Sequence, residues 1–138
     1  MLELFDFVSQ NWILAAIWVG FLVLLIVSES ARGGKSLSPQ QATTLINTRD
    51  AVVVDVRKSD EFGKGHLPSA INIPSAKIKD RLGELEKHKE KPIIVVCQLG
   101  QSAGAAGAEL RKAGFNEVYR LKGGVAEWRS SRMPLVKK

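Results

Sequence analysis

The sequence of 138 residues contains a single cysteine, Cys97, so no disulfide bond can form within the chain. One unpaired thiol is typical of a reducing compartment, where it is either packed as a small apolar side chain or used for its reactivity. Histidine is almost as scarce, with two residues, and the chain has no internal repeat and no low-complexity tract. A disulfide scaffold is therefore excluded, and the position of the one thiol becomes informative.

Charge is absent from residues 7–28. As a helix this stretch would be about 33 Å long, enough to cross the hydrocarbon core of a bilayer. A cleaved signal peptide is disfavoured because Glu3 and Asp6 make the start of the chain acidic. A buried helix of this length would have little to pack against in so small a protein. We therefore predict a retained single-pass transmembrane anchor over residues 1–30, which contacts membrane lipid through residues 7–28.

Basic residues are absent before this stretch and begin directly after it, with Arg32 and Lys35. The positive-inside rule then predicts an N-terminus outside and a soluble part in the cytoplasm. We expect residues 31–36 to form a flexible linker and residues 37–138 to form one domain.

The soluble part is strongly basic, with all 20 Lys and Arg against 11 of the 14 acidic residues, a net charge of +9. Such a surface attracts anionic lipid headgroups or anionic substrates, or simply keeps the domain soluble. The basic residues are scattered without interleaved aromatics, so we expect no nucleic-acid partner.

Short apolar runs alternate with helical patterns along the soluble part. Residues 51–56 and 92–97 are almost continuously apolar, which is typical of strands covered on both faces in a parallel sheet. Ser38 and Gln41 have the spacing of a capping box around a helix start. The sequence therefore predicts an α/β fold with an open parallel sheet and helices on both of its faces. Further strands are expected at 71–73 and 117–121, and further helices at 103–113 and 123–131.

Cys97 ends the strand at 92–97 and is followed by a short loop that leads into the helix at 103–113. The carboxyl ends of strands are where open α/β sheets bind ligands. Unpaired N–H groups and the helix dipole at the start of a helix stabilise a thiolate. Gly100 allows the loop to curl so that successive N–H groups point inward and bind an anion. The pattern favours a nucleophilic thiol that handles anions.

Two other thiol chemistries fit less well. Cysteine phosphatases place an Arg six residues after the cysteine to clamp phosphate, whereas this chain has Ala103 there. A cysteine–histidine hydrolase would need His66 or His88, and each of these lies in a segment that favours a structural or solvated role. A packed, unreactive Cys97 also remains an alternative.

Three stretches resemble single-domain rhodaneses: "DVRKSDEFGKGHLPSAINIP", "VVCQLGQSAGAAGAELRKAGF" and "VYRLKGGVAEW". They occur in the family's order and spacing and lie within residues 38–133. The sequence is therefore similar to membrane-tethered bacterial rhodanese-like sulfurtransferases. The resemblance implies a rhodanese-like fold and a location in the bacterial inner membrane.

The resemblance also implies a mechanism. Cys97 would be the catalytic nucleophile, which takes sulfane sulfur from a small anionic donor such as thiosulfate and becomes a persulfide. It would then pass the sulfur to a thiol or to cyanide, with neither a metal nor a cofactor. The substrate-binding loop would consist of Gln98, Leu99, Gly100, Gln101 and Ser102.

The loop departs from the family at one point. Many members read Cys-x-x-Gly-x-Arg-Ser, and the Arg helps to hold an anionic donor. This chain has Ser102 at the Arg position and Ala103 at the Ser position, so no charged side chain remains in the loop. The identity of the donor is accordingly open.

Asp55 and Arg57 match the family's Asp-x-Arg, and we expect them to support the site structurally, with contact between Arg57 and the pocket as the alternative. Other motif positions are expected to shape loops or the core rather than perform chemistry. They are Glu61, His66, Pro68, Ala70, Asn72, Pro74, Gly123, Gly124 and Trp128.

The sequence leaves a second function open. The missing loop Arg is also compatible with a membrane-tethered interaction module of little or no activity, which would dock to a membrane protein or a soluble partner. Retention of Cys97 favours the sulfurtransferase.

Overall fold

The computed structural model describes residues 1–32, 34–100 and 102–137, which form two compact units, Met1–Ala31 and Arg32–Lys138. The first unit contains the uncharged stretch, and the second contains the sheet with its helices.

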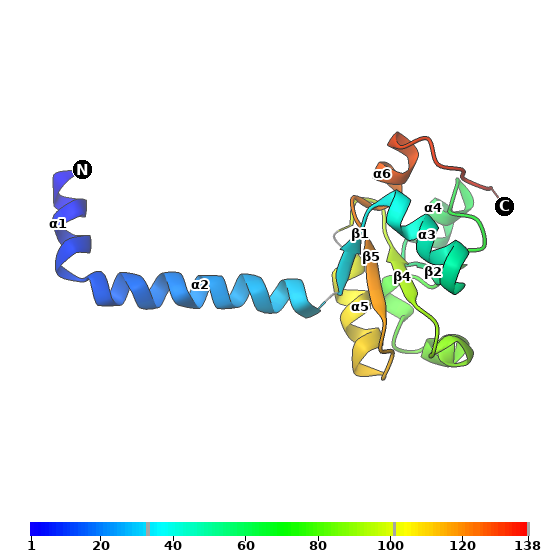
Figure 1. Ribbon diagram of the computed structural model, residues 1–138, viewed down its shortest axis with the longest axis horizontal. Helices are drawn as coiled ribbons and strands as arrows, with labels where there is room; N and C mark the ends of the chain where they lie inside the picture. Colours follow the sequence, from blue (N-terminus) through cyan, green and yellow to red (C-terminus); the bar gives the residue numbers. More distant parts are fainter. Residues whose placement is uncertain (33, 101, 138) are drawn as a thin grey trace. The chain divides into compact units, whose positions relative to one another are not determined.

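The first unit consists of two helices, α1 (Leu2–Gln10) and α2 (Trp12–Arg32), rather than one unbroken helix over residues 7–28 (Figure 1). The break lies at Asn11, whose side-chain amide donates a hydrogen bond of 2.9 Å to the carbonyl of Phe7. Its backbone N–H donates to the same carbonyl over 3.1 Å. Asparagine ends the helix because its side chain competes with the backbone for hydrogen bonds.

The apolar side chains of α1 and α2 are largely exposed. No single helix in the described part of the chain is both long and apolar enough to span a membrane. By length and composition, Leu2–Gln10 and Trp12–Ser28 together meet that requirement as a pair bent by 87°. The expected single transmembrane helix therefore stays a prediction.

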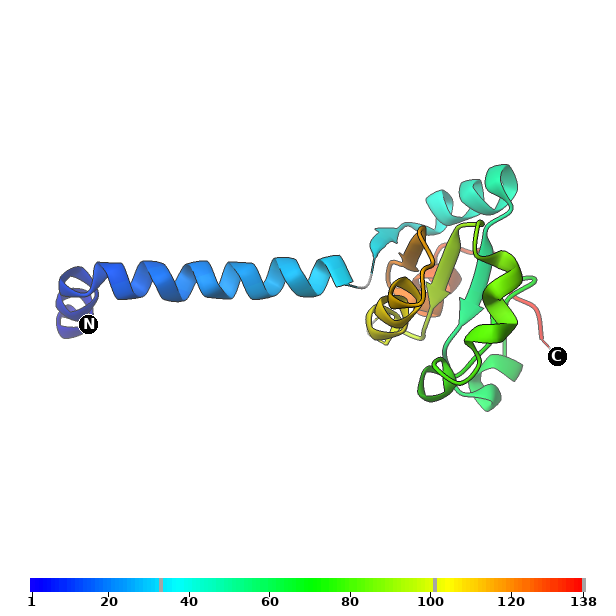
Figure 2. The same cartoon turned by 90° about the horizontal axis from the view of Figure 1, so that it is seen from below.

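The second unit is built on a five-stranded sheet whose neighbouring strands are all parallel, in the order β1-β5-β4-β2-β3 (Figure 2). The central strands are apolar on both faces, as expected for strands covered on both sides. The strands are β1 (Lys35–Leu37), β2 (Val52–Asp55), β3 (Ile71–Asn72), β4 (Ile93–Val96) and β5 (Val118–Leu121).

Two apolar cores lie on opposite faces of the sheet. One contains Val95, Cys97 and residues of α5 (Ala103–Lys112), together with residues from the short 3₁₀ helices η1 (Ser75–Lys77) and η2 (Leu82–His88). The other packs α3 (Pro39–Arg49) and α6 (Gly124–Ser130) against the sheet. The predicted α/β fold with a parallel sheet and helices on both faces is confirmed.

The start of α3 agrees with its predicted cap. The Ser38 hydroxyl accepts a hydrogen bond from the backbone N–H of Gln41, and the Gln41 side chain accepts one from the N–H of Ser38. Trp128 is also buried in the core, as expected, and its indole N–H donates to the carbonyl of Pro134 over 2.8 Å.

Two segments differ from the sequence expectation. Lys35 and Ser36, assigned to the linker 31–36, belong to β1, which pairs with β5 at the edge of the sheet. The segment between β2 and β3 contains the short helix α4 (Ser59–Gly63), which the sequence does not predict. Neither element has a hydrophobic period of its own, because β1 is an exposed edge strand and α4 is a single turn.

Candidate active site

Cys97 lies directly after β4, at the carboxyl end of a central strand of the sheet, and is 4% exposed. Its side chain belongs to the same apolar core as Ala103 and Ala106 of α5. The sulfur atom is therefore held between the end of a strand and the first turns of a helix, which is the position that the sequence predicts for the thiol.

The loop after Cys97 turns a backbone donor toward the sulfur. The N–H of Gly100 donates a hydrogen bond to Cys97 Sγ over 2.9 Å. Gly100 has φ +92°, a conformation that residues with a side chain rarely adopt, which explains the glycine. A donor aimed at sulfur stabilises negative charge that develops there during a reaction.

The first turn of α6 secures this loop from the other side. The backbone N–H groups of Val125 and Ala126 donate to the carbonyls of Cys97 and Gln98 over 2.9 and 3.1 Å. The approach is possible because Gly124 has no side chain: a Cβ there would lie 2.2 Å from the carbonyl oxygen of Cys97. Gly124 also has φ +61°. The sequence marks this glycine as part of a motif, but its contact with the cysteine loop emerges from the fold.

The loop residues predicted to bind substrate follow Cys97 toward α5. The side chains of Gln98, Leu99 and Ser102 are exposed, and that of Leu99 reaches 61%. Gln101 lies outside the described residues. Ser102 precedes α5 without a side-chain capping bond, so its hydroxyl stands at the start of that helix without filling the cap.

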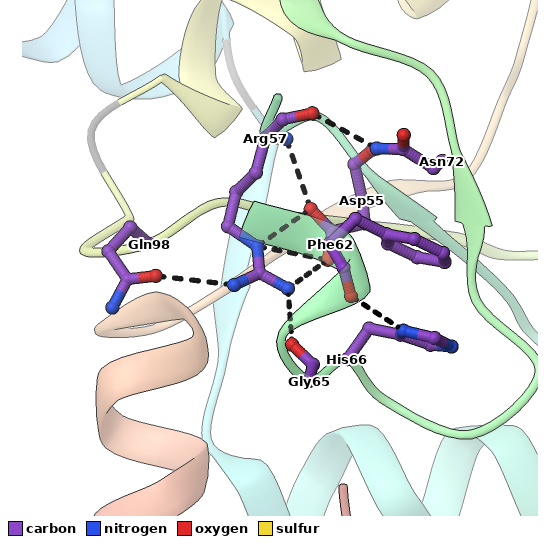
Figure 3. Close-up of polar contacts among 7 residues, drawn as sticks. All are labelled: Asp55, Arg57, Phe62, Gly65, His66, Asn72 and Gln98. Atoms are coloured by element: carbon purple, nitrogen blue, oxygen red, sulfur yellow. Dashed lines mark hydrogen bonds and ion pairs between the residues drawn. The ribbon is translucent and has the colours of Figure 1, made fainter. Parts of the chain in front are cut away.

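Asp55 and Arg57 form an ion pair that is almost fully buried, with side-chain exposures of 0% and 4% (Figure 3). The guanidinium donates to the Asp55 carboxylate through Nε and through Nη2, the latter over 2.8 Å. Nη2 also donates to the carbonyl of Gly65 over 2.7 Å, and Nη1 reaches Gln98 Oε1 over 3.3 Å. Arg57 therefore joins the end of β2 to the α4 loop and to the residue after Cys97, so it serves as a structural support that also touches the loop.

The other motif residues near this pair hold the backbone. The Asn72 side-chain amide donates to the carbonyls of Asp55 and Arg57 over 3.1 and 3.0 Å. The His66 ring stacks on Phe62 with 3.7 Å between centroids, and its Nδ1 lies 2.9 Å from the Phe62 carbonyl oxygen. These contacts agree with the structural role expected for His66.

A pocket of about 540 Å³ borders Arg57 and Gln98. Three different segments contribute its other walls, so the sequence pattern did not reveal it. Glu61, Lys64 and Gly65 come from α4 and the residues after it. Arg129 comes from α6, and Leu135 and Lys137 come from the C-terminal segment. In the part of the chain that the structure describes, no three His, Cys, Asp or Glu side chains gather as metal ligands.

The Rhodanese-like domain family matches residues 38–131, which is most of the second unit. The Escherichia coli K12 protein named "Uncharacterized protein YibN" is 43% identical to this chain and covers 99% of both sequences. A thiosulfate sulfurtransferase, GlpE of Coxiella burnetii, is 34% identical over 70% of this chain and 88% of its own length. Among solved structures, a rhodanese-related protein of Thermoplasma volcanium superposes with a TM-score of 0.68 at 27% identity, over 75% of this chain and 99% of its own.

The contact between α6 and the cysteine loop leads to a prediction for Gly124→Ala. The added Cβ would collide with the Cys97 carbonyl, and alanine would be strained at this positive φ. We expect a loss of about 2 kcal/mol or more in the free energy of unfolding. For a domain of this size, that lowers Tm by about 8 °C or more, measurable by circular dichroism. Gly83→Ala is the matched control because a Cβ there meets nothing within 4 Å. Equal Tm values for the two variants would contradict the contact.

A second prediction concerns the buried ion pair. Arg57→Met leaves the Asp55 carboxylate buried without its cation, which we expect to cost about 3 kcal/mol or more in urea unfolding. The double variant Asp55→Asn with Arg57→Met removes the uncompensated charge and should lose less stability than Arg57→Met alone. If the double variant is the less stable of the two, the ion pair is not what sets the cost.

Proposed function

This chain belongs to the rhodanese-like family, and from that premise we propose that it is a sulfurtransferase that carries sulfane sulfur as a persulfide on Cys97. The observation that carries the proposal is the Gly100 N–H aimed at Cys97 Sγ over 2.9 Å, in a loop at the carboxyl end of β4.

The first step loads the sulfur. The Cys97 thiolate attacks the sulfane sulfur of an anionic donor such as thiosulfate, and a sulfur lone pair forms the new S–S bond. The S–S bond of the donor breaks, and its electron pair leaves with sulfite. The charge that was on Sγ moves to the outer sulfur of the persulfide. The Gly100 donor and the amino end of α5 favour negative charge at this place both before and after the step.

The second step discharges the persulfide. An acceptor thiolate, or cyanide in an assay, attacks the outer sulfur and forms a new bond to it. The bond between that sulfur and Sγ breaks, and its electron pair returns to Cys97 as a thiolate. The shallow, exposed loop formed by Gln98 and Leu99 leaves room for an acceptor to approach. Gln98, Leu99, Gly100, Gln101 and Ser102 thus remain the proposed substrate-binding residues, with Asp55 and Arg57 as their support.

The persulfide is the outcome to measure. We expect the full-length protein in mild detergent, incubated with thiosulfate without oxygen, to gain one sulfur atom by intact mass spectrometry. Cyanide should remove the sulfur as thiocyanate. Cys97→Ser is the control and should gain none. If thiosulfate, mercaptopyruvate and a low-molecular-weight persulfide all leave the wild-type mass unchanged, the sulfurtransferase proposal is wrong.

We further propose that the first unit anchors the protein in a bacterial inner membrane, with the second unit in the cytoplasm. The proposal is supported by the exposed apolar side chains of α1 and α2, such as Leu14, Trp18 and Phe21, and by the basic residues that follow them.

Fractionation tests the anchor. We expect the full chain to stay with the membrane pellet after extraction with alkaline carbonate, whereas a chain that begins at Arg32 should be in the supernatant. Recovery of both chains in the supernatant would exclude an integral anchor. Protease added to spheroplasts should leave the second unit intact if it faces the cytoplasm.

One observation favours a second candidate function, a tethered module that docks to a protein partner. Leu99 is a large apolar side chain exposed to 61% directly beside the cysteine. Burying this apolar side chain against a partner surface would remove it from water, which favours docking. A Cys97→Ser strain with a wild-type phenotype, together with a Leu99→Ser strain that has lost it, would identify docking as the function.

A further inference from the structure

The pocket beside the cysteine loop carries more positive than negative charge. Lys64, Arg129 and Lys137 contribute three cations, and Glu61 contributes one carboxylate. The fourth cation, Arg57, is already neutralised by its ion pair with Asp55. Within the described ranges, no carboxylate forms an ion pair with Lys64, Arg129 or Lys137. They are therefore available to an anionic ligand.

The walls of this pocket are held in place. Gly65 is one of the lining residues. Its carbonyl accepts a hydrogen bond from Arg57 over 2.7 Å, and a Cβ on it would lie 3.8 Å from Arg129 Nη2 and 3.9 Å from Leu135 Cδ1. The guanidinium of Arg129 is thus positioned over the loop that follows α4.

The C-terminal segment forms a fixed wall as well. Val136 pairs with His66 in an antiparallel bridge, with backbone hydrogen bonds of 2.9 and 2.8 Å. The Trp128 indole binds the carbonyl of Pro134, and the N–H of Met133 donates to the carbonyl of Trp128. These contacts hold the segment that carries Leu135 and Lys137 against the domain.

The pocket borders the cysteine loop at Gln98, the residue directly after Cys97. The Gln98 side chain lines the pocket. Its Oε1 accepts a hydrogen bond from Arg57 Nη1 over 3.3 Å (Figure 3). Consecutive Cα atoms of an extended peptide are about 3.8 Å apart. An acceptor peptide can therefore place a carboxylate side chain in the pocket while the thiol of the adjacent residue approaches the sulfur on Cys97. A volume of about 540 Å³ exceeds the needs of an ion such as thiosulfate and suits a ligand the size of a short peptide.

We propose that this basic pocket, made by Lys64, Arg129 and Lys137, binds the carboxylates of an acidic, peptide-sized thiol that accepts the sulfur from Cys97. The inference rests on the proposed sulfurtransferase function and names the class of its acceptor. The cations stand beside the loop, so they bind the acceptor's flanking groups, whereas backbone donors hold the sulfur itself. The acceptor thiolate takes the outer sulfur, and the electron pair of the broken S–S bond returns to Cys97.

Matched peptides test the acceptor's charge. The protein is the full chain in detergent, loaded as the persulfide. The acceptors are acetyl-Glu-Cys-Glu-amide and acetyl-Gln-Cys-Gln-amide, with rates divided by the thiolate concentration of each peptide. At low salt we expect the acidic peptide to accept sulfur about tenfold faster. The preference should shrink as salt is raised, because surface charges are screened.

Matched variants locate the effect. The triple variant Lys64→Gln, Arg129→Gln and Lys137→Gln should lose the preference to within about twofold. The control variant Lys77→Gln, Lys87→Gln and Lys112→Gln removes the same charge from exposed positions outside the pocket and should keep the preference. An equal loss in both variants, or an unchanged preference in the pocket variant, would overturn the proposal.

A binding measurement separates this proposal from the sulfurtransferase itself. Acetyl-Glu-Ser-Glu-amide should shift the amide resonances of Gly65 and Leu135 in the Cys97→Ser protein, and less so in the pocket variant. If binding occurs but no persulfide forms, the proposed function fails and the basic pocket remains. If the persulfide transfers its sulfur without charge preference or binding, the acceptor assignment fails and the sulfurtransferase remains.

Discussion

The buried ion pair between Asp55 and Arg57 is the interaction on which the arrangement of the site depends. It places two charges where almost no water reaches, so each needs its partner and several hydrogen bonds. Arg57 donates hydrogen bonds to the carbonyl of Gly65, in the loop that follows α4, and to the side chain of Gln98, in the cysteine loop. A charge that must be satisfied at the end of β2 therefore determines how three separate segments meet.

A second constraint acts from the other side of the loop. The first turn of α6 donates two backbone hydrogen bonds to the carbonyls of Cys97 and Gln98, and it approaches so closely that Gly124 leaves no room for a side chain. With those carbonyls engaged, the chain reverses at Gly100 and turns its N–H toward the sulfur. The donor that favours an anionic sulfur is thus a result of backbone packing and needs no charged side chain in the loop.

The backbone donor also bears on Ser102, which stands where many rhodaneses have an arginine. A sulfurtransferase needs to stabilise negative charge at the transferred sulfur, and it needs to bind the sulfur donor and the sulfur acceptor. In the function proposed for this chain the backbone provides the first, and the pocket cations Arg129, Lys64 and Lys137 come from α6, the end of α4 and the C-terminal segment. The acceptor site that we propose therefore lies in the pocket and not in the cysteine loop itself.

The sequence by itself determined the places of β2, β3, β4 and β5 and of α3, α5 and α6 along the chain, the cap of α3, and the position of Cys97 between a strand and a helix. Each of these is encoded in residues close together along the chain. Single-turn and edge elements such as α4 and β1 have no period to detect, and the break at Asn11 depends on one side chain. Only the tertiary structure decided how Gly124 meets the Cys97 carbonyl and how the pocket cations come together. Those contacts join residues far apart in sequence, and no local pattern records a distance across the fold.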